Sequence, residues 1–223
     1  MSDTITKMPI LSVADLAAGY SGMPVLQGFS LEISPGMILL IKGMNGSGKT
    51  TLLRCCAGLL PPLAGRIMIT GTPLAADRLH AARRTIYIGH RDGLAAELTS
   101  EETLNLWAAS RGLCPGPDDL KESFAALGMG EVMDQPLRTL SQGQQRRVSM
   151  TRLALITRLG LTRETPLWLL DEPTTAMDST ATKAFAALMH AHAEAGGAAV
   201  LTTHHDPGII GAETLTLLGR RNT

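Results

Sequence analysis

Residues 43–50 read GMNGSGKT, between an apolar run at 37–41 and a helical pattern that follows. The spacing matches the phosphate-loop pattern GxxxxGK[ST] between a strand and a helix. Glycines let the backbone curl so that N–H groups converge on phosphate oxygens, and the helix N-terminus adds positive charge. Lys49 is expected to reach the β- and γ-phosphates and the Thr50 hydroxyl to join a magnesium shell. The candidate nucleotide contacts are Gly43, Asn45, Gly46, Gly48, Lys49, Thr50 and Thr51.

A second motif is an apolar run at 167–170 that ends in two carboxylates, Asp171 and Glu172. A buried strand would deliver them to the carboxyl edge of the sheet, where open α/β folds bind ligands. There Asp171 can hold magnesium and Glu172 can accept a proton from the attacking water. Alone, the pattern is better explained by a strand that runs into a solvated turn. Its pairing with the phosphate loop favours the catalytic interpretation.

A third motif, LSQGQQRR, spans residues 140–147. Ser141 and Gln144 have the spacing of a capping box, which any helix can use. The Ser141 hydroxyl and the Gly143 amide at a helix N-terminus also make an anion site, and residues 137–163 contain arginines but no acid. By itself this motif supports a plain helix cap and an anion site equally.

Short aliphatic runs alternate with turn signals and helical patterns along the chain, as in an α/β fold. We expect strands at 10–13, 25–33, 37–41, 66–69, 86–88, 167–170, 198–202 and 215–218. We expect helices after Gly48 and at 101–111, 118–127, 144–159 and 179–195. The stretch 90–140 has helical patterns and hardly a strand, which predicts a helical lobe set into an α/β core.

The composition narrows the class of protein. The 223 residues carry 20 basic and 20 acidic side chains, and 44% are apolar, so the chain is a packed fold rather than a disordered one. Zero net charge argues against a nucleic-acid partner. Three cysteines form neither a disulfide framework nor a zinc spacing, which favours a reducing, cytoplasmic setting. Since no apolar run approaches about 18 residues, contact with a membrane would go through a partner.

The three motifs in this order resemble the nucleotide-binding subunit of ATP-binding cassette (ABC) transporters, over about residues 10–218. The resemblance implies an ATPase that uses ATP and Mg²⁺. It also implies a single ABC-type ATP-binding domain over 1–223 with a P-loop NTPase core, an antiparallel β subdomain, and a helical subdomain inserted at about 91–145.

The resemblance assigns further roles by position. Tyr20 stands where the family stacks an aromatic ring on adenine, and residues 140–144 resemble its signature loop, with Gln142 where a second glycine is usual. Asp178 is placed at a dimer seam. The nucleotide would thus also contact Tyr20, Ser141, Gly143 and Gln144.

The catalytic set implied by the resemblance is Lys49, Glu172 and His204. His204 resembles the family's switch histidine, although the adjacent His205 is an alternative. His90 stands where the family usually has a glutamine that touches magnesium. It therefore joins Thr50 and Asp171 as a candidate metal ligand, but an imidazole is shorter and can titrate, so a glutamine-like role is open.

Residues 87–94 and 97–99 are similar to one branch of the family, the ATP-binding subunits of the haem exporter in cytochrome c maturation. That branch implies integral-membrane transporter subunits as partners, indirectly a periplasmic haem chaperone, and a peripheral position on the cytoplasmic face of the inner membrane. The family pattern also implies a head-to-tail dimer with a second copy of the chain and ATP sandwiched between them. The alternatives are the ATPase subunit of another small-molecule transporter and an ABC ATPase without a transport role.

Overall fold

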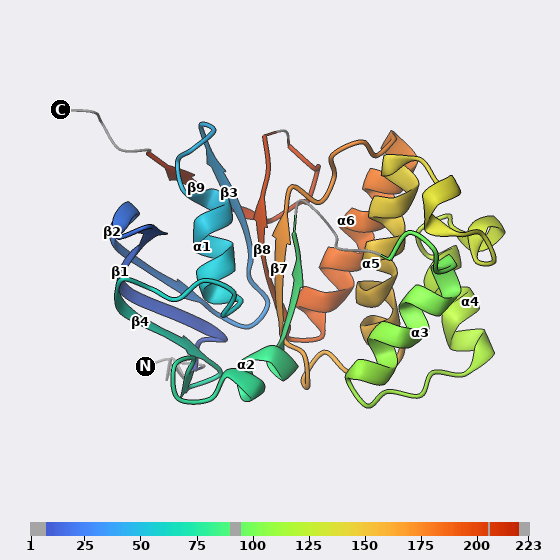
Figure 1. Cartoon of the computed structure of the whole chain (residues 1–223), viewed down its shortest axis with the longest axis horizontal. Coiled ribbons are helices and arrows are strands. Elements are labelled where there is room, and N and C mark those ends of the chain that lie inside the picture. The colour runs from blue at the N-terminus through green and yellow to red at the C-terminus, as the bar shows by residue number, and fades with distance from the viewer. Residues whose placement is uncertain (1–7, 90–94, 205, 219–223) are drawn as a thin grey trace, which may run out of the picture.

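The computed structural model describes residues 8–89, 95–204 and 206–218, which build two β-sheets with helices between and beside them (Figure 1). The parallel sheet has the order β6 (Thr85–Ile88), β7 (Leu167–Asp171), β8 (Ala198–Thr202), β3 (Ile38–Gly43), β9 (Glu213–Leu217). The antiparallel sheet has the order β2 (Met23–Ile33), β1 (Leu11–Tyr20), β4 (Ala64–Ile69), β5 (Thr72–Pro73). The predicted α/β class with an antiparallel β subdomain is confirmed.

The parallel sheet is buried on both faces, as parallel sheets usually are. In β3, Leu39 and Ile41 pack in a cluster with the antiparallel sheet and helix α1 (Lys49–Cys56). Ile38 and Leu40 point to the opposite side and pack with buried residues of the helices between 100 and 194. Because successive side chains of a strand alternate between faces, one short run of aliphatic residues supplies both halves of the core.

Four longer helices cover the second face of the parallel sheet: α3 (Ser100–Ser110), α4 (Pro117–Ala125), α5 (Gln142–Arg158) and α6 (Ser179–Glu194). Figure 1 shows α5 and α6 beside the sheet and α3 and α4 on the outside. From 95 to 141 the chain forms α3, α4 and two 3₁₀ turns, Gly130–Val132 and Leu137–Thr139. The helical subdomain at about 91–145 stays a prediction; helix α5, which begins inside that range, continues to Arg158 and packs on the core. No helix within the described ranges is long and apolar enough to cross a bilayer.

Most predicted elements are present, with three differences. The first strand runs to Tyr20, whereas the sequence predicted that it ends at 13. The second half was missed because a bulge at Asp15, with φ +50°, interrupts the alternation of apolar and polar residues. The two-residue β5 was not predicted. Helix α2 (Arg78–Arg84) was also missed, since only Ala81 of its seven residues is buried and the sequence therefore lacks an apolar stripe.

Candidate functional site

The loop 43–48 joins β3 to α1, and its glycines have structural causes. Gly48 adopts a left-handed conformation, with φ +99°, immediately before Lys49 begins the helix. A Cβ on Gly43 would lie 2.6 Å from the carbonyl oxygen of Leu217. The loop therefore needs glycine for conformation at one end and for close packing at the other.

The side chain of Lys49 is buried and folds back over this loop. Its Nζ donates to the carbonyl oxygens of Gly43 at 2.8 Å and Met44 at 3.1 Å. The ammonium of Lys49 thus lies next to the backbone amides of the helix N-terminus. Both groups favour an anionic ligand. Of the other predicted contacts, Asn45 and Gly46 are exposed in the loop, whereas Thr51 is buried in α1.

The carboxylate of Asp171 is held by two other elements. Thr50 Oγ1, in the first turn of α1, donates to Asp171 Oδ2 at 2.9 Å, and Thr202 Oγ1, at the end of β8, donates to Oδ1 at 2.6 Å. The structure thus brings together two predicted metal ligands that lie 121 residues apart in sequence. Hard hydroxyl and carboxylate oxygens suit Mg²⁺, which retains several waters and binds few protein ligands. His90, the third candidate, lies outside the described residues.

Glu172 and His204 form a pair beyond the ends of β7 and β8. His204 Nε2 lies 3.0 Å from Glu172 Oε1, and the two side chains are 37% and 26% exposed respectively, so the pair is open to solvent. The amide of Glu172 donates to Thr202 Oγ1 at 2.9 Å. A carboxylate that is oriented by a histidine and open to water is arranged to accept a proton. The rival residue His205 lies outside the described residues.

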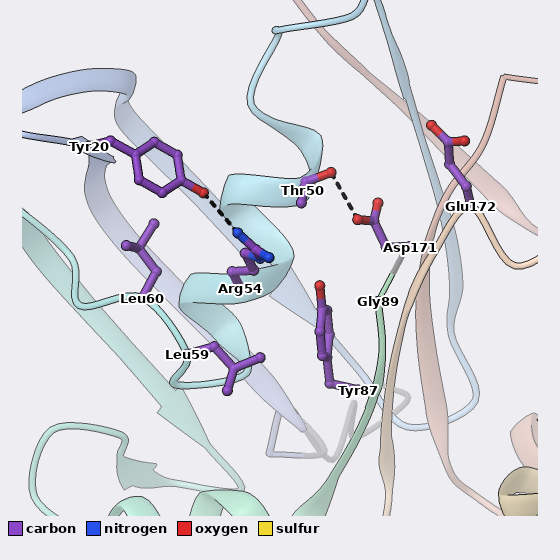
Figure 2. A pocket seen from close by; sticks show the side chains of 9 residues that line it. All are labelled: Tyr20, Thr50, Arg54, Leu59, Leu60, Tyr87, Gly89, Asp171 and Glu172. Atoms are coloured by element: carbon purple, nitrogen blue, oxygen red, sulfur yellow. Dashed lines mark hydrogen bonds between the residues drawn. The ribbon is translucent and has the colours of Figure 1, made fainter. Parts of the chain in front are cut away.

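A pocket of about 850 Å³ links Thr50, Asp171 and Glu172 to Tyr20, the last residue of β1. Figure 2 shows its lining, which comprises Tyr20, Thr50, Arg54, Leu59, Leu60, Tyr87, Gly89, Asp171 and Glu172. The polar end holds the carboxylates, and the other end offers aromatic and aliphatic surface. The pocket therefore has room and chemistry for both the charged and the flat part of a nucleotide.

The signature residues form the capping box that the sequence predicted. Gln144 N donates to Ser141 Oγ at 3.2 Å, and Ser141 N donates to Gln144 Oε1 at 2.9 Å. A Cβ on Gly143 would lie 2.4 Å from the carbonyl oxygen of Ala176, so this position admits only glycine without rearrangement. Residues 141–144 are not among the described residues that line the nucleotide-sized pocket.

The family model described as ABC transporter matches residues 26–175. This chain belongs to the ABC transporter family. The expected ABC-type ATPase, with ATP as its nucleotide, is thereby confirmed. An ATP-binding subunit of an ABC transporter of known structure is 28% identical with a TM-score of 0.76, over 87% of this chain and 79% of that one. An ABC transporter ATP-binding protein from Pyrococcus furiosus has the same fold, with a TM-score of 0.77 at 24% identity, over 93% and 96% of the two chains.

The curated relatives confirm the resemblance to the cytochrome c branch. The Cupriavidus necator protein named cytochrome c biogenesis ATP-binding export protein CcmA is 39% identical over 96% of this chain and 90% of its own length. The protein of the same name from Aromatoleum aromaticum is 41% identical over 91% and 92%. The similarity spans nearly the whole of both chains.

Within this ABC-family site, sequence reasoning missed five lining residues, namely Arg54, Leu59, Leu60, Tyr87 and Gly89, and a signal existed for Arg54. Arg54 lies four residues after Thr50, on the same face of α1. Its guanidinium donates to Tyr20 Oη at 3.4 Å, and this hydrogen bond is the main cause that raises the pKa of Arg54. Burial raises the pKa of Tyr87. Tyr87, Leu59 and Leu60 face the pocket only because of how the strands and the turn after α1 pack.

Asp178 has a visible structural role in this ABC-family chain. Its Oδ1 accepts a hydrogen bond from Ala181 N at 2.7 Å and so caps helix α6. The cap fixes the loop that carries Ala176 against Gly143. The placement of Asp178 at a dimer seam stays a prediction.

Proposed function

We propose that this chain is the ATP-hydrolysing subunit of a transporter complex for c-type cytochrome biogenesis, which drives haem export or releases the haem-loaded chaperone. Support comes from relatives named cytochrome c biogenesis ATP-binding export protein CcmA, 37–41% identical over most of the chain, and from residues 87–94 and 97–99. The proposal includes integral-membrane subunits as direct partners and, indirectly, a periplasmic haem chaperone. It places the chain peripherally on the cytoplasmic face of the inner membrane.

One observation carries the chemistry: Thr50, at the end of the phosphate loop, binds Asp171, and the adjacent Glu172 pairs with His204. In the proposed site, Tyr20 stacks on adenine and the loop amides with Lys49 hold the phosphates. Thr50 and Asp171 would hold Mg²⁺, which when bound offsets charge on the β- and γ-phosphates. Glu172 takes a proton from the attacking water, and His204 orients that carboxylate.

We infer that two copies pair head to tail, each completing the other's site. Ser141 is exposed, and the capped N-terminus of α5 is absent from the lining of its own chain's pocket within the described residues. A helix N-terminus favours anions, so a second chain's Ser141, Gly143 and Gln144 would meet the γ-phosphate across the interface. Because ADP lacks that phosphate, hydrolysis removes the contact and favours opening.

A mixing experiment tests this arrangement. Glu172→Gln and Ser141→Arg are each expected to bind ATP and to lack steady-state turnover. In a mixed dimer, the two defects fall in the same site and the other site is intact. Equal mixing should restore about a quarter of wild-type ATPase, because half the dimers are mixed and each has one working site.

Three outcomes would contradict parts of the proposal. A mixture as inactive as its components would show that the site is not shared between chains. Brisk hydrolysis by Glu172→Gln alone would show that another group is the base. Loss of ATP binding by the Ser141→Arg monomer would place Ser141 in its own chain's site.

The transport branch needs a separate test. The tagged chain should co-purify from detergent-solubilised membranes with integral-membrane subunits and a haem-binding chaperone. Recovery of a different permease would assign the chain to another small-molecule transporter, and recovery of ribosomes or DNA would exclude a transport role.

A further inference from the structure

Arg146 is a buried arginine in the second turn of α5, and its side chain reaches the carboxyl ends of β6 and β7. Only 6% of the residue is exposed. Among the described residues, its guanidinium donates to the backbone carbonyls of Gly89 just after β6, Asp171 at the end of β7, and Glu172, the last at 3.1 Å. A buried cation is costly unless it is well hydrogen-bonded. Its position under the ends of two neighbouring strands therefore reflects a definite structural task.

That task concerns the conformation of Glu172, which has φ +51°. A residue with a side chain rarely adopts this left-handed conformation, and it persists only where surrounding groups enforce it. On the N-terminal side, the amide of Glu172 donates to Thr202 Oγ1 at 2.9 Å and the Asp171 carbonyl accepts from Arg146. On the C-terminal side, the carbonyl of Glu172 accepts from Arg146. Arg146 thus holds the peptide groups on both sides of the strained residue.

We propose that Arg146 is a positioning residue for ATP hydrolysis, which holds Glu172 in its left-handed conformation and so directs the carboxylate toward His204. The proposal rests on the role of Glu172 as the proton acceptor. A planar guanidinium offers five donors in a fixed fork and can join carbonyls of separate strands at once, whereas a lysine ammonium is a compact point charge.

The same side chain ties the catalytic glutamate to the signature helix. Arg146 follows Ser141 by five residues in α5, and its contacts to β6 and β7 fix the start of that helix against the sheet edge. In the proposed dimer, the α5 N-terminus meets one nucleotide while Glu172 acts on the other. Arg146 therefore couples the geometry of the two sites.

The test compares Arg146→Gln and Arg146→Lys with wild type in the full-length chain. We expect Arg146→Gln to lower kcat roughly tenfold to a hundredfold, the size of loss that about 1 Å of misplacement produces. The Kd for a fluorescent ATP analogue should stay within about twofold, because the phosphate loop, Lys49 and Tyr20 are untouched. Arg146→Lys should recover part of the kcat. A folded Arg146→Gln with wild-type kcat, or an equal loss of ATP affinity, would overturn the proposal.

Arg158→Gln is the matched control. Arg158 lies in the last turn of the same helix and is partly exposed, with its Nε 2.9 Å from Asp119 Oδ1 on α4. This variant removes the same charge and should keep wild-type kcat. If its kcat fell as far as that of Arg146→Gln, the loss would belong to the helix as a whole, and the positioning role would be rejected.

A double-mutant cycle locates the effect. In single-turnover assays, Arg146→Gln should add nothing to the loss caused by Glu172→Gln, because the residue acts through that carboxylate. Multiplicative losses would overturn the proposal while leaving Glu172 as the base, whereas a fully active Glu172→Gln would instead overturn the proposed base. Should Arg146→Gln fail to fold at the assay temperature, Arg146→Lys decides: an intermediate kcat with unchanged Kd supports the role, and a wild-type kcat refutes it.

Discussion

We expect buried His192 of α6 to make the free energy of unfolding of this protein decrease in acid. Its ring is fully buried and stacks on Trp168 of β7, with centroids 3.6 Å apart and planes 10° from parallel. Its Nε2 lies 3.1 Å from the Pro166 carbonyl oxygen, and Gly197 packs directly on the ring. Burial lowers the pKa of His192 from 6.5 to about 4.

The sign and size of the effect follow from these two pKa values. Between pH 6.5 and about 4 the unfolded chain binds a proton that the folded protein excludes. The free energy of unfolding therefore falls as the pH falls through this window. Linkage gives a loss of about 2 kcal/mol between pH 7 and pH 5 from this group alone.

The assay is urea unfolding of wild type and His192→Phe at several pH values from 7 to 5. Phenylalanine keeps an aromatic ring against Trp168 but cannot be protonated. The stability difference between the two proteins should therefore shift by about 2 kcal/mol in favour of the variant as the pH falls. A difference that stays constant with pH would refute the claim that His192 is neutral and buried in the folded state.

Two further predictions test packing at the site and the state of the thiols. Gly143→Ala should lower the free energy of unfolding by about 1–3 kcal/mol, because its Cβ would meet the carbonyl oxygen of Ala176. Gly130→Ala is the control and should be neutral, because a Cβ there has no atom within 4 Å. Equal stability of the two variants in urea titrations would contradict this prediction. Exposed Cys114 should react with a thiol reagent far faster than buried Cys55, because burial raises the pKa of the Cys55 thiol to about 11. Quenched labelling followed by peptide mass analysis measures both rates. Comparable rates would show that the core around α1 opens.

Local patterns predicted the elements whose signals are local. The loop 43–50, the apolar run before Asp171 and the Ser141 capping box all appear as expected, because glycine spacing, strand alternation and cap chemistry act over a few residues. Elements with weak local patterns were missed, namely α2 and β5.

Contacts between distant segments had no comparable signal. The spacing of the motifs does not reveal that Thr202 holds Asp171 or that Arg146 binds the carbonyls around Glu172. From the sequence, Arg146 is one of several arginines after the signature loop, with no mark of burial. The same applies to Tyr87, whose ring faces the pocket because of the way β6 pairs with β7.

The amino-acid sequence by itself determined the class of fold, the phosphate loop and the residue types that ATP chemistry requires, because each depends on the spacing of residues close together in the chain. Only the tertiary structure decided which of those residues meet, how Glu172 is held in a left-handed conformation, and which neighbours complete the pocket. Those outcomes depend on how the sheets and helices of the described residues pack together, which brings residues more than a hundred positions apart into contact.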